Sequence, residues 1–142
     1  MGLGIAMALK MNNSPAKVYV MLGDGELEEG TVWEAIMTAP AFGVDNLIAI
    51  LDCNNIQKMD FVEKTIGVPN WSAKWKSSGW DVLETDGHDM EDFKSTILSE
   101  NNSGMPRLII ANTIKGKGVS IMENNPNWHF RLPGRKELKI FK

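Results

Sequence analysis

Cysteine is nearly absent from this sequence, since Cys53 is the single one among 142 residues. A lone cysteine excludes an internal disulfide framework and suits a reducing compartment, so we expect a cytoplasmic protein. Long apolar runs are missing as well, because the longest, such as 47–51 and 108–111, are too short to cross a bilayer. The apolar start of the chain follows no basic region, which favours a helix over a signal peptide.

A strong excess of charge of either sign is also lacking. The formal net charge is -3 at pH 7, with 23% charged and 43% apolar residues. This balance is typical of a soluble globular domain. It provides no basic stripe for nucleic acid and no attraction to a membrane surface, so we expect neither as a partner.

What the sequence does contain is an alternation of two kinds of segment. Spacing and composition predict helices over 3–11, 26–39, 71–78 and 88–100, and apolar runs predict strands over 18–22, 46–52, 80–85 and 107–114. The first two strands are predicted to be buried on both faces. The alternation predicts the α/β class, a parallel sheet with helices on both faces. From residue 115 onward, glycine, asparagine and proline predict loop.

Glycines and polar residues follow the predicted strands, and in parallel sheets ligands bind beyond this carboxyl edge. The first strand ends in Gly23-Asp24-Gly25. The glycines allow a sharp turn and a close approach to a ligand, and the N–H groups of the helix predicted to follow suit a phosphate. Aspartate is a hard oxygen ligand for Mg²⁺ or Ca²⁺, although an ordinary Asp-Gly turn is the alternative interpretation.

The position of Asn54 strengthens the metal interpretation. One helix and one strand fit between Gly25 and Asn54, which predicts that Asn54 ends the strand adjacent to that of Asp24. Its amide oxygen is then a second ligand, and the backbone carbonyl of Ile56 is a third. Diphosphate oxygens and water would complete an octahedron around Mg²⁺.

Several longer segments match the sequence motifs of one enzyme family. They are Gly-Asp-Gly-Glu-Leu-Glu-Glu-Gly-Thr-Val-Trp-Glu-Ala at 23–35, Asp-Asn-Leu-Ile-Ala-Ile-Leu-Asp-Cys-Asn-Asn-Ile-Gln at 45–57, Asp-Gly-His-Asp at 86–89, Ile-Lys-Gly-Lys-Gly-Val at 114–119, and Trp-His at 128–129. Together they resemble the N-terminal, thiamine-diphosphate-binding half of transketolase, especially the version split between two polypeptides. The resemblance extends from about residue 2 to residue 129.

The resemblance implies a thiamine-diphosphate-binding fold and a set of cofactor-binding residues. These residues are Gly23, Asp24, Gly25, Asn54, Ile56, Ile114 and His129. By similarity, Asp24, Asn54 and the carbonyl of Ile56 hold Mg²⁺ (or Ca²⁺). Gly25 places its backbone against the diphosphate, and Ile114 packs near the ring system of the cofactor.

Three residues are implied to take part in catalysis. Glu29 and Glu34 match acidic positions at the family's subunit interface, which approach the partner glutamate that activates the aminopyrimidine. Solvated helix charges are the alternative for both. His129 matches the histidine that reaches the diphosphate and lines the substrate channel, with a structural histidine as the alternative. The family follows this histidine with glycine, whereas Phe130-Arg131-Leu132 follows it here.

Other conspicuous residues are expected to be structural. We expect His88 to be structural, with Asp86 and Asp89 capping the next helix. Lys115 and Lys117 either neutralise phosphate or are solvated loop lysines. The tryptophans at 33, 71, 75 and 80 are expected to pack, and the lone cysteine is expected to be buried in apolar surroundings.

Transketolases transfer a two-carbon ketol unit from a ketose phosphate to an aldose phosphate, and the activating glutamate lies in a separate pyrimidine-binding domain. The resemblance implies that 1–129 is a partial diphosphate-binding domain and 130–142 a C-terminal tail. It also implies that a Gly-Ser-Leu-Gly-Gln-Gly segment is missing ahead of Gly2. We therefore expect a truncated N-terminal subunit that needs a partner chain with the pyrimidine-binding domain, in a homo- or hetero-oligomer. The alternatives are an inactive remnant or interaction module, a deoxyxylulose-phosphate synthase, and a 2-oxo-acid dehydrogenase E1 component.

Overall fold

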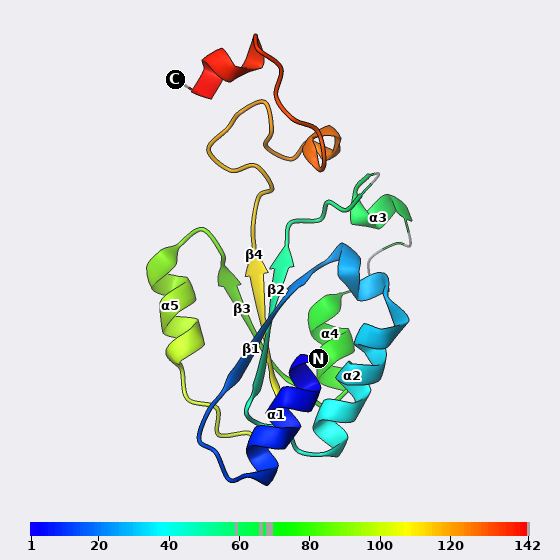
Figure 1. Ribbon diagram of the computed structural model, residues 1–142, viewed down its shortest axis with the longest axis vertical. Coiled ribbons are helices and arrows are strands. Elements are labelled where there is room, and N and C mark those ends of the chain that lie inside the picture. The colour runs from blue at the N-terminus through cyan, green and yellow to red at the C-terminus, as the bar shows by residue number, and fades with distance from the viewer. Residues whose placement is uncertain (59, 66, 68–69, 142) are drawn as a thin grey trace.

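Four parallel strands form one sheet in the computed structural model, which describes residues 1–58, 60–65, 67 and 70–141 (Figure 1). The strands are β1 (Val18–Gly23), β2 (Leu47–Cys53), β3 (Asp81–Asp86) and β4 (Arg107–Asn112). Their order across the sheet is β1-β2-β4-β3, and each neighbouring pair is parallel. The predicted α/β class is confirmed, as are the four predicted strands.

Helices lie on both faces of this sheet, as the alternating pattern predicts. On one face lie α1 (Gly2–Met11), α2 (Gly30–Ala41) and α4 (Trp71–Ser77), and on the other lies α5 (Met90–Leu98) (Figure 1). The connections contain α3 (Val62–Thr65) and the 3-10 helices η1 (Gly25–Glu28), η2 (Pro126–Trp128) and η3 (Glu137–Phe141). Within the described ranges, every helix is too short or too polar to cross a membrane.

The main core lies between the sheet and the helices α1, α2 and α4. Every second residue of β2 faces this core, where three tryptophans are 8% exposed or less. Trp75 and Trp80 pack edge to face with ring centroids 4.6 Å apart. The Trp80 indole N–H donates to the carbonyl oxygen of Ile36 over 2.8 Å, which ties α2 to the start of β3. The predicted packing role of these tryptophans is confirmed.

The prediction that the first strand is buried on both faces is wrong. β1 is an edge strand, and its side chains Tyr19 and Met21 are 48% and 65% exposed. On the face of the sheet away from the main core, α5 packs against β3 and β4. It therefore leaves the side chains of β1 on that face uncovered. The helix α5 is itself only partly covered, because its side chains Met90 and Leu98 are 63% and 70% exposed.

The prediction of one helix over 26–39 is also wrong in its first turn. Glu29 has an extended backbone (φ -77°, ψ 126°), and it separates the four-residue η1 from α2. Leu27 anchors η1 in the core at 1% exposure, and its carbonyl accepts the Trp33 indole N–H over 2.7 Å. The burial of Leu27 and its hydrogen bond with Trp33 are made together with the interruption of the helix at Glu29. The first of the helical N–H groups predicted to suit a phosphate, that of Gly25, is taken by the Asp24 carboxylate itself.

The chain after β4 consists mainly of turns, as predicted, interrupted by η2 and η3. It rises beyond the carboxyl ends of the strands (Figure 1). This placement sets Lys115 and His129 above the strand-end residues described next.

Candidate metal and cofactor site

The ends of β1 and β2 bring the two halves of the predicted site together. The strands pair with Gly23 opposite Asp52, so the residues that follow each strand are neighbours. One carboxylate oxygen of Asp24 accepts the Gly25 N–H over 2.8 Å, and the other accepts the N–H of Asn55. The predicted adjacency of Asp24 and the Asn54 segment is therefore confirmed.

Asp24 is a buried carboxylate, with 2% exposure. Burial raises the pKa of Asp24 above its ordinary value of 3.8, although the backbone N–H groups of Asn55 and Gly25 lower it in part. The nearby negative charge of Asp52 adds to the increase. A cation close to this carboxylate would favour its ionised form, and carboxylate oxygens are ligands that Mg²⁺ and Ca²⁺ prefer.

The side chain of Asn54 is held at both of its polar ends. Its Nδ2 donates to Asp52 over 3.0 Å, and its Oδ1 accepts the backbone N–H of Ile56 over 3.0 Å. Asn55 between them has a positive φ of 61°, a conformation that asparagine tolerates better than most residues. This tight turn explains why the Asn54 amide and the Ile56 backbone lie on the same side as Asp24.

Gly25 is required by a close contact with the same loop. A Cβ at this position would lie 2.5 Å from the Cβ of Gln57. Gln57 is itself fixed, because its Nε2 donates to Glu28 over 2.8 Å and also contacts the Thr65 hydroxyl. The packing of this turn therefore requires glycine at position 25, independently of any ligand.

A hollow of about 390 Å³ opens between these strand ends and the chain after β4. Its lining residues are Gly23, Asp24, Gly25, Glu26, Asp52, Asn54, Ile56, Gln57, Lys58, Lys115 and His129. Three carboxylates face two lysines and a histidine in this set. Such a balance does not attract an anionic diphosphate by itself, so a cation has to accompany it.

The hollow is also lined by four residues for which the resemblance implied no role, namely Asp52, Glu26, Gln57 and Lys58. The sequence could have indicated Asp52, because it is an acidic residue at the end of an otherwise apolar predicted strand that leads to Asn54. Lys115 lines the hollow, which favours the phosphate interpretation of this lysine over that of a solvated loop residue. Lys117 lies instead in a neighbouring hollow.

His129 lies at the end of η2 and reaches the hollow as predicted, with its side chain exposed. Arg131 stacks over the ring of Trp128, 4.0 Å from its centroid, and pairs with Glu137. These contacts give the unusual residues after His129 a local structural role. Glu29 and Glu34 are exposed and are not among the described residues that line the hollow.

Ile114 is the predicted cofactor residue that the structure sets apart. It lines a separate hollow of about 430 Å³ together with His88. The Nε2 atom of His88 accepts the Ile114 backbone N–H over 2.7 Å, so this histidine holds the turn after β4. Asp89 caps α5 as predicted, whereas the Asp86 carboxylate accepts the His88 N–H and caps no helix in the described chain.

Cys53 is a free thiol, half-buried beside the site, and it packs against the main core. Burial raises the pKa of Cys53 to about 11, and the charges of Asp24, Asp52 and Glu84 add to the effect. The thiol therefore stays protonated near neutral pH. The expected buried and apolar setting is found only in part, because Cys53 is half-buried and three carboxylates lie near it.

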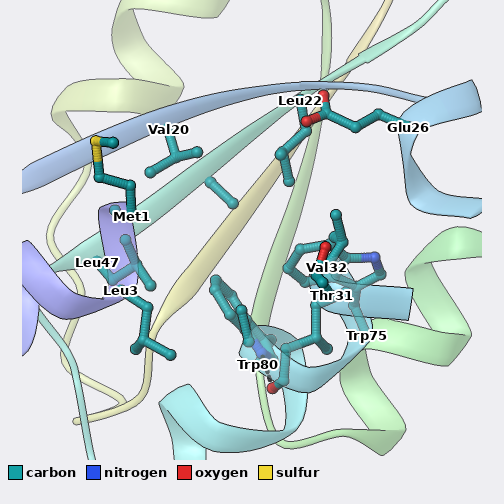
Figure 2. A pocket seen from close by; sticks show the side chains of 14 residues that line it. Met1, Leu3, Val20, Leu22, Glu26, Thr31, Val32, Leu47, Trp75 and Trp80 are labelled. Carbon is teal, nitrogen blue, oxygen red and sulfur yellow. Dashed lines mark hydrogen bonds between the residues drawn. The ribbon is translucent and has the colours of Figure 1, made fainter. Parts of the chain in front are cut away.

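A further hollow of about 340 Å³ lies between the start of α1, β1 and α2. Figure 2 shows Met1, Leu3 and Val20 on one side of it, and Trp75 and Trp80 on the other. Its lining is mainly apolar, with Glu26 and Thr31 as its polar side chains, and Asp24 and Asn54 are not among the described residues that line it. It is a gap in packing, and the chemistry lies at the carboxyl edge.

The residues at the strand ends fit a metal that is shared with a diphosphate. In the part of the chain that the structure describes, no group of three or more His, Cys, Asp or Glu side chains is placed to hold a metal alone. Mg²⁺ commonly takes one or two carboxylates and completes its shell with phosphate oxygens and water. One carboxylate, one amide oxygen and one backbone carbonyl are a donor set of that kind.

Comparisons with known proteins place this geometry in context. The family model "Transketolase, thiamine diphosphate binding domain" matches residues 9–142. One of the subunits of apulose-4-phosphate transketolase from Phocaeicola vulgatus is 42% identical over 133 residues, covering 93% of this chain and 47% of that protein. The 6-deoxy-6-sulfo-D-fructose transketolase subunit SqwG of Clostridium sp. (strain MSTE9) is 37% identical over 122 residues, 85% of this chain and 44% of that protein.

Solved structures give the same result. The crystal structure of transketolase from Campylobacter jejuni matches with a TM-score of 0.81 and 28% identity, over 98% of this chain and 27% of that one. The chain thus spans about half the length of the curated subunits that it matches.

Proposed function

Because this chain belongs to the thiamine diphosphate binding domain family of transketolases, we propose that it binds thiamine diphosphate through Mg²⁺ and serves in ketol transfer with a partner chain. The observation that carries the proposal is the buried Asp24 carboxylate beside the Asn54 amide at adjacent strand ends. Asp24, Asn54 and the carbonyl of Ile56 hold the metal, and Ca²⁺ is an acceptable substitute.

The residues of this chain bind and orient the cofactor, which supplies a carbanion for attack on a ketose carbonyl when it is bound. Gly23 leaves open space beside the metal, since a Cβ there would meet nothing within 4 Å, and Gly25 would place its backbone against the diphosphate. Lys115 and His129 line the hollow from the chain after β4, where the lysine would offset remaining negative charge and the imidazole would hydrogen-bond the diphosphate. Ile114 contacts the ring system from the adjacent hollow.

The partner proposed here is a second chain that carries the pyrimidine-binding domain. Two similar proteins are named as transketolase subunits, which supports a site shared between chains. Glu29 and Glu34 are exposed on η1–α2 and available to such a partner. Replacing both by glutamine is expected to weaken association and ketol transfer while Mg²⁺-dependent cofactor binding persists. Loss of cofactor binding in that variant would contradict the interface role.

The substrate class proposed is an anionic ketose, with transfer of its two-carbon ketol unit to an aldose phosphate in the cytoplasm. The names of the similar subunits include one phosphorylated and one sulfonated sugar, which supports a substrate with a terminal anionic group. The division into a partial domain over 1–129 and a tail over 130–142 is part of the same proposal.

Calorimetric titration tests the metal site directly. Thiamine diphosphate is titrated with and without Mg²⁺ into the chain alone and into its mixture with a candidate partner chain. Binding is expected to require Mg²⁺ and to disappear in Asp24→Ala. The matched control is Asp45→Ala, an exposed carboxylate paired with Lys10 far from the strand ends. Absence of binding in both samples, or binding unchanged by Asp24→Ala, would refute the proposal.

A further inference from the structure

The carboxylate of Asp52 joins two loops of the site. One of its oxygens accepts the Nδ2 of Asn54 over 3.0 Å, and the other accepts the hydroxyl of Thr113. Thr113 follows β4, the strand that pairs with β2 on its other side. The Thr113 backbone N–H also donates to the Cys53 carbonyl over 3.2 Å. Asp52 therefore connects the loop after β2 with the loop that leads to Ile114.

An ionised carboxylate accepts hydrogen bonds and donates none. The end of the Asn54 amide that faces Asp52 must therefore be its NH₂ group. This fixes the Oδ1 atom on the opposite side, where it accepts the Ile56 N–H over 3.0 Å. An amide oxygen has two lone pairs, so one stays free for a cation.

We propose that Asp52 is a positioning residue, which orients the Asn54 amide and clamps the β2 and β4 loops through its two hydrogen bonds. The consequence for the metal rests on the proposed function, whereas the orientation of the amide does not. Groups outside the ligand shell that orient a metal ligand commonly change affinity by 10–100-fold. Asp52 acts through Asn54 and Thr113, not through its negative charge.

Two substitutions distinguish an effect of the Asp52 hydrogen bonds from an effect of its negative charge. In Asp52→Ala both hydrogen bonds are lost. In Asp52→Asn the new carbonyl oxygen accepts from Asn54, and the new NH₂ donates to Thr113, because a hydroxyl is both donor and acceptor. The asparagine thus removes the charge and keeps both contacts.

The first measurement needs no cofactor. In the ¹⁵N-labelled chain, the side-chain NH₂ resonances of Asn54 are expected to shift in Asp52→Ala and to stay near their original positions in Asp52→Asn. Thr113→Val removes one partner of Asp52 and is expected to shift the same resonances by less. If Asp52→Ala does not fold, the Thr113→Val and Asp52→Asn spectra decide alone. An Asn54 signal that none of these changes affects would overturn the inference.

The second measurement is the Mg²⁺-dependent affinity for thiamine diphosphate, in the chain or its mixture with the partner. Asp52→Ala is expected to weaken it by about 10–100-fold. Asp52→Asn is expected to stay within about threefold, since the hydrogen bonds persist. Equal losses in both variants would show that the charge matters and would overturn the positioning role. If the unmodified protein binds no cofactor, the proposed function fails, and the Asn54 spectra still decide the inference.

Discussion

Replacing Gly25 by alanine tests whether the turn after β1 is built around the absence of a side chain. The new Cβ would lie 2.5 Å from the Cβ of Gln57. Carbon atoms pack at about 3.5–4.0 Å, so one of the two segments must move by roughly 1 Å or more. Gln57 has little freedom to move, since it is hydrogen-bonded to Glu28 and Thr65. Overpacking of this kind costs about 1–3 kcal/mol of the free energy of unfolding.

Gly30→Ala is the matched control, because a Cβ there meets nothing within 4 Å. Gly30 is the first residue of α2, and alanine in a helix is more stable than glycine by up to about 1 kcal/mol. The two substitutions add the same methyl group five residues apart. They should nevertheless differ by about 1–4 kcal/mol, with Gly25→Ala the less stable.

Thermal unfolding and urea titration measure this difference. At about 4 °C per kcal/mol for a domain near this size, Gly25→Ala should lower the Tm by roughly 4–12 °C. In the double variant Gly25→Ala/Gln57→Gly the two effects should be less than additive, because the clashing Cβ is gone. If Gly25→Ala is as stable as Gly30→Ala, or if the double variant shows no coupling, the steric explanation is wrong.

Three further predictions concern stability. Arg107→Ala should cost about 1.5–3 kcal/mol in urea unfolding, because this 6%-exposed side chain donates to the 25%-exposed Asp81 and to the carbonyls of Ser99 and Glu100; a cost under about 0.5 kcal/mol would contradict this. Trp80→Phe should cost about 1 kcal/mol more than Trp75→Phe, since the Trp80 indole N–H has a hydrogen-bond partner, whereas that of Trp75 has none among the described residues; equal costs would refute this. Hydrogen bonds lower the pKa of Asp92 below 3.8, so its stabilising contribution is complete above that pH and is lost as the pH falls through the lowered pKa. The unfolding midpoint of Asp92→Ala should therefore be lower than that of the unmodified chain at pH 7 and should approach it at acidic pH; a constant gap would contradict the linkage.

Local patterns predicted the secondary structure well where one segment has one strong signal. The apolar runs that became β2 and β4 are such cases; β2 is buried as expected, and β4 is buried as well. The same signal failed for β1, because an apolar run does not tell whether a neighbouring strand or helix covers it. It also failed at Glu29, where the anchoring of Leu27 and Trp33 overrides helix spacing.

The adjacency of the candidate ligands was predictable from the sequence, and the contacts around them were not. Parallel pairing of consecutive strands made the adjacency of Asp24 and Asn54 a consequence of the order of the elements. The roles of Asp52 and Gln57 had to come from the structure, because each depends on a contact with a distant segment. Ile114 was expected beside the same ligand, yet it lies in the neighbouring hollow with His88.

By itself the sequence determined the α/β class, the residues available at the carboxyl edge and the resemblance to transketolases. These follow from periodicity, from residue chemistry and from segments that are local in the chain. The tertiary structure alone decided that Asp24 is buried, that Gly25 has no room for a side chain, and that the Asn54 amide is turned by Asp52. Burial and hydrogen bonding between strand ends depend on how distant segments meet, and no local pattern encodes that meeting.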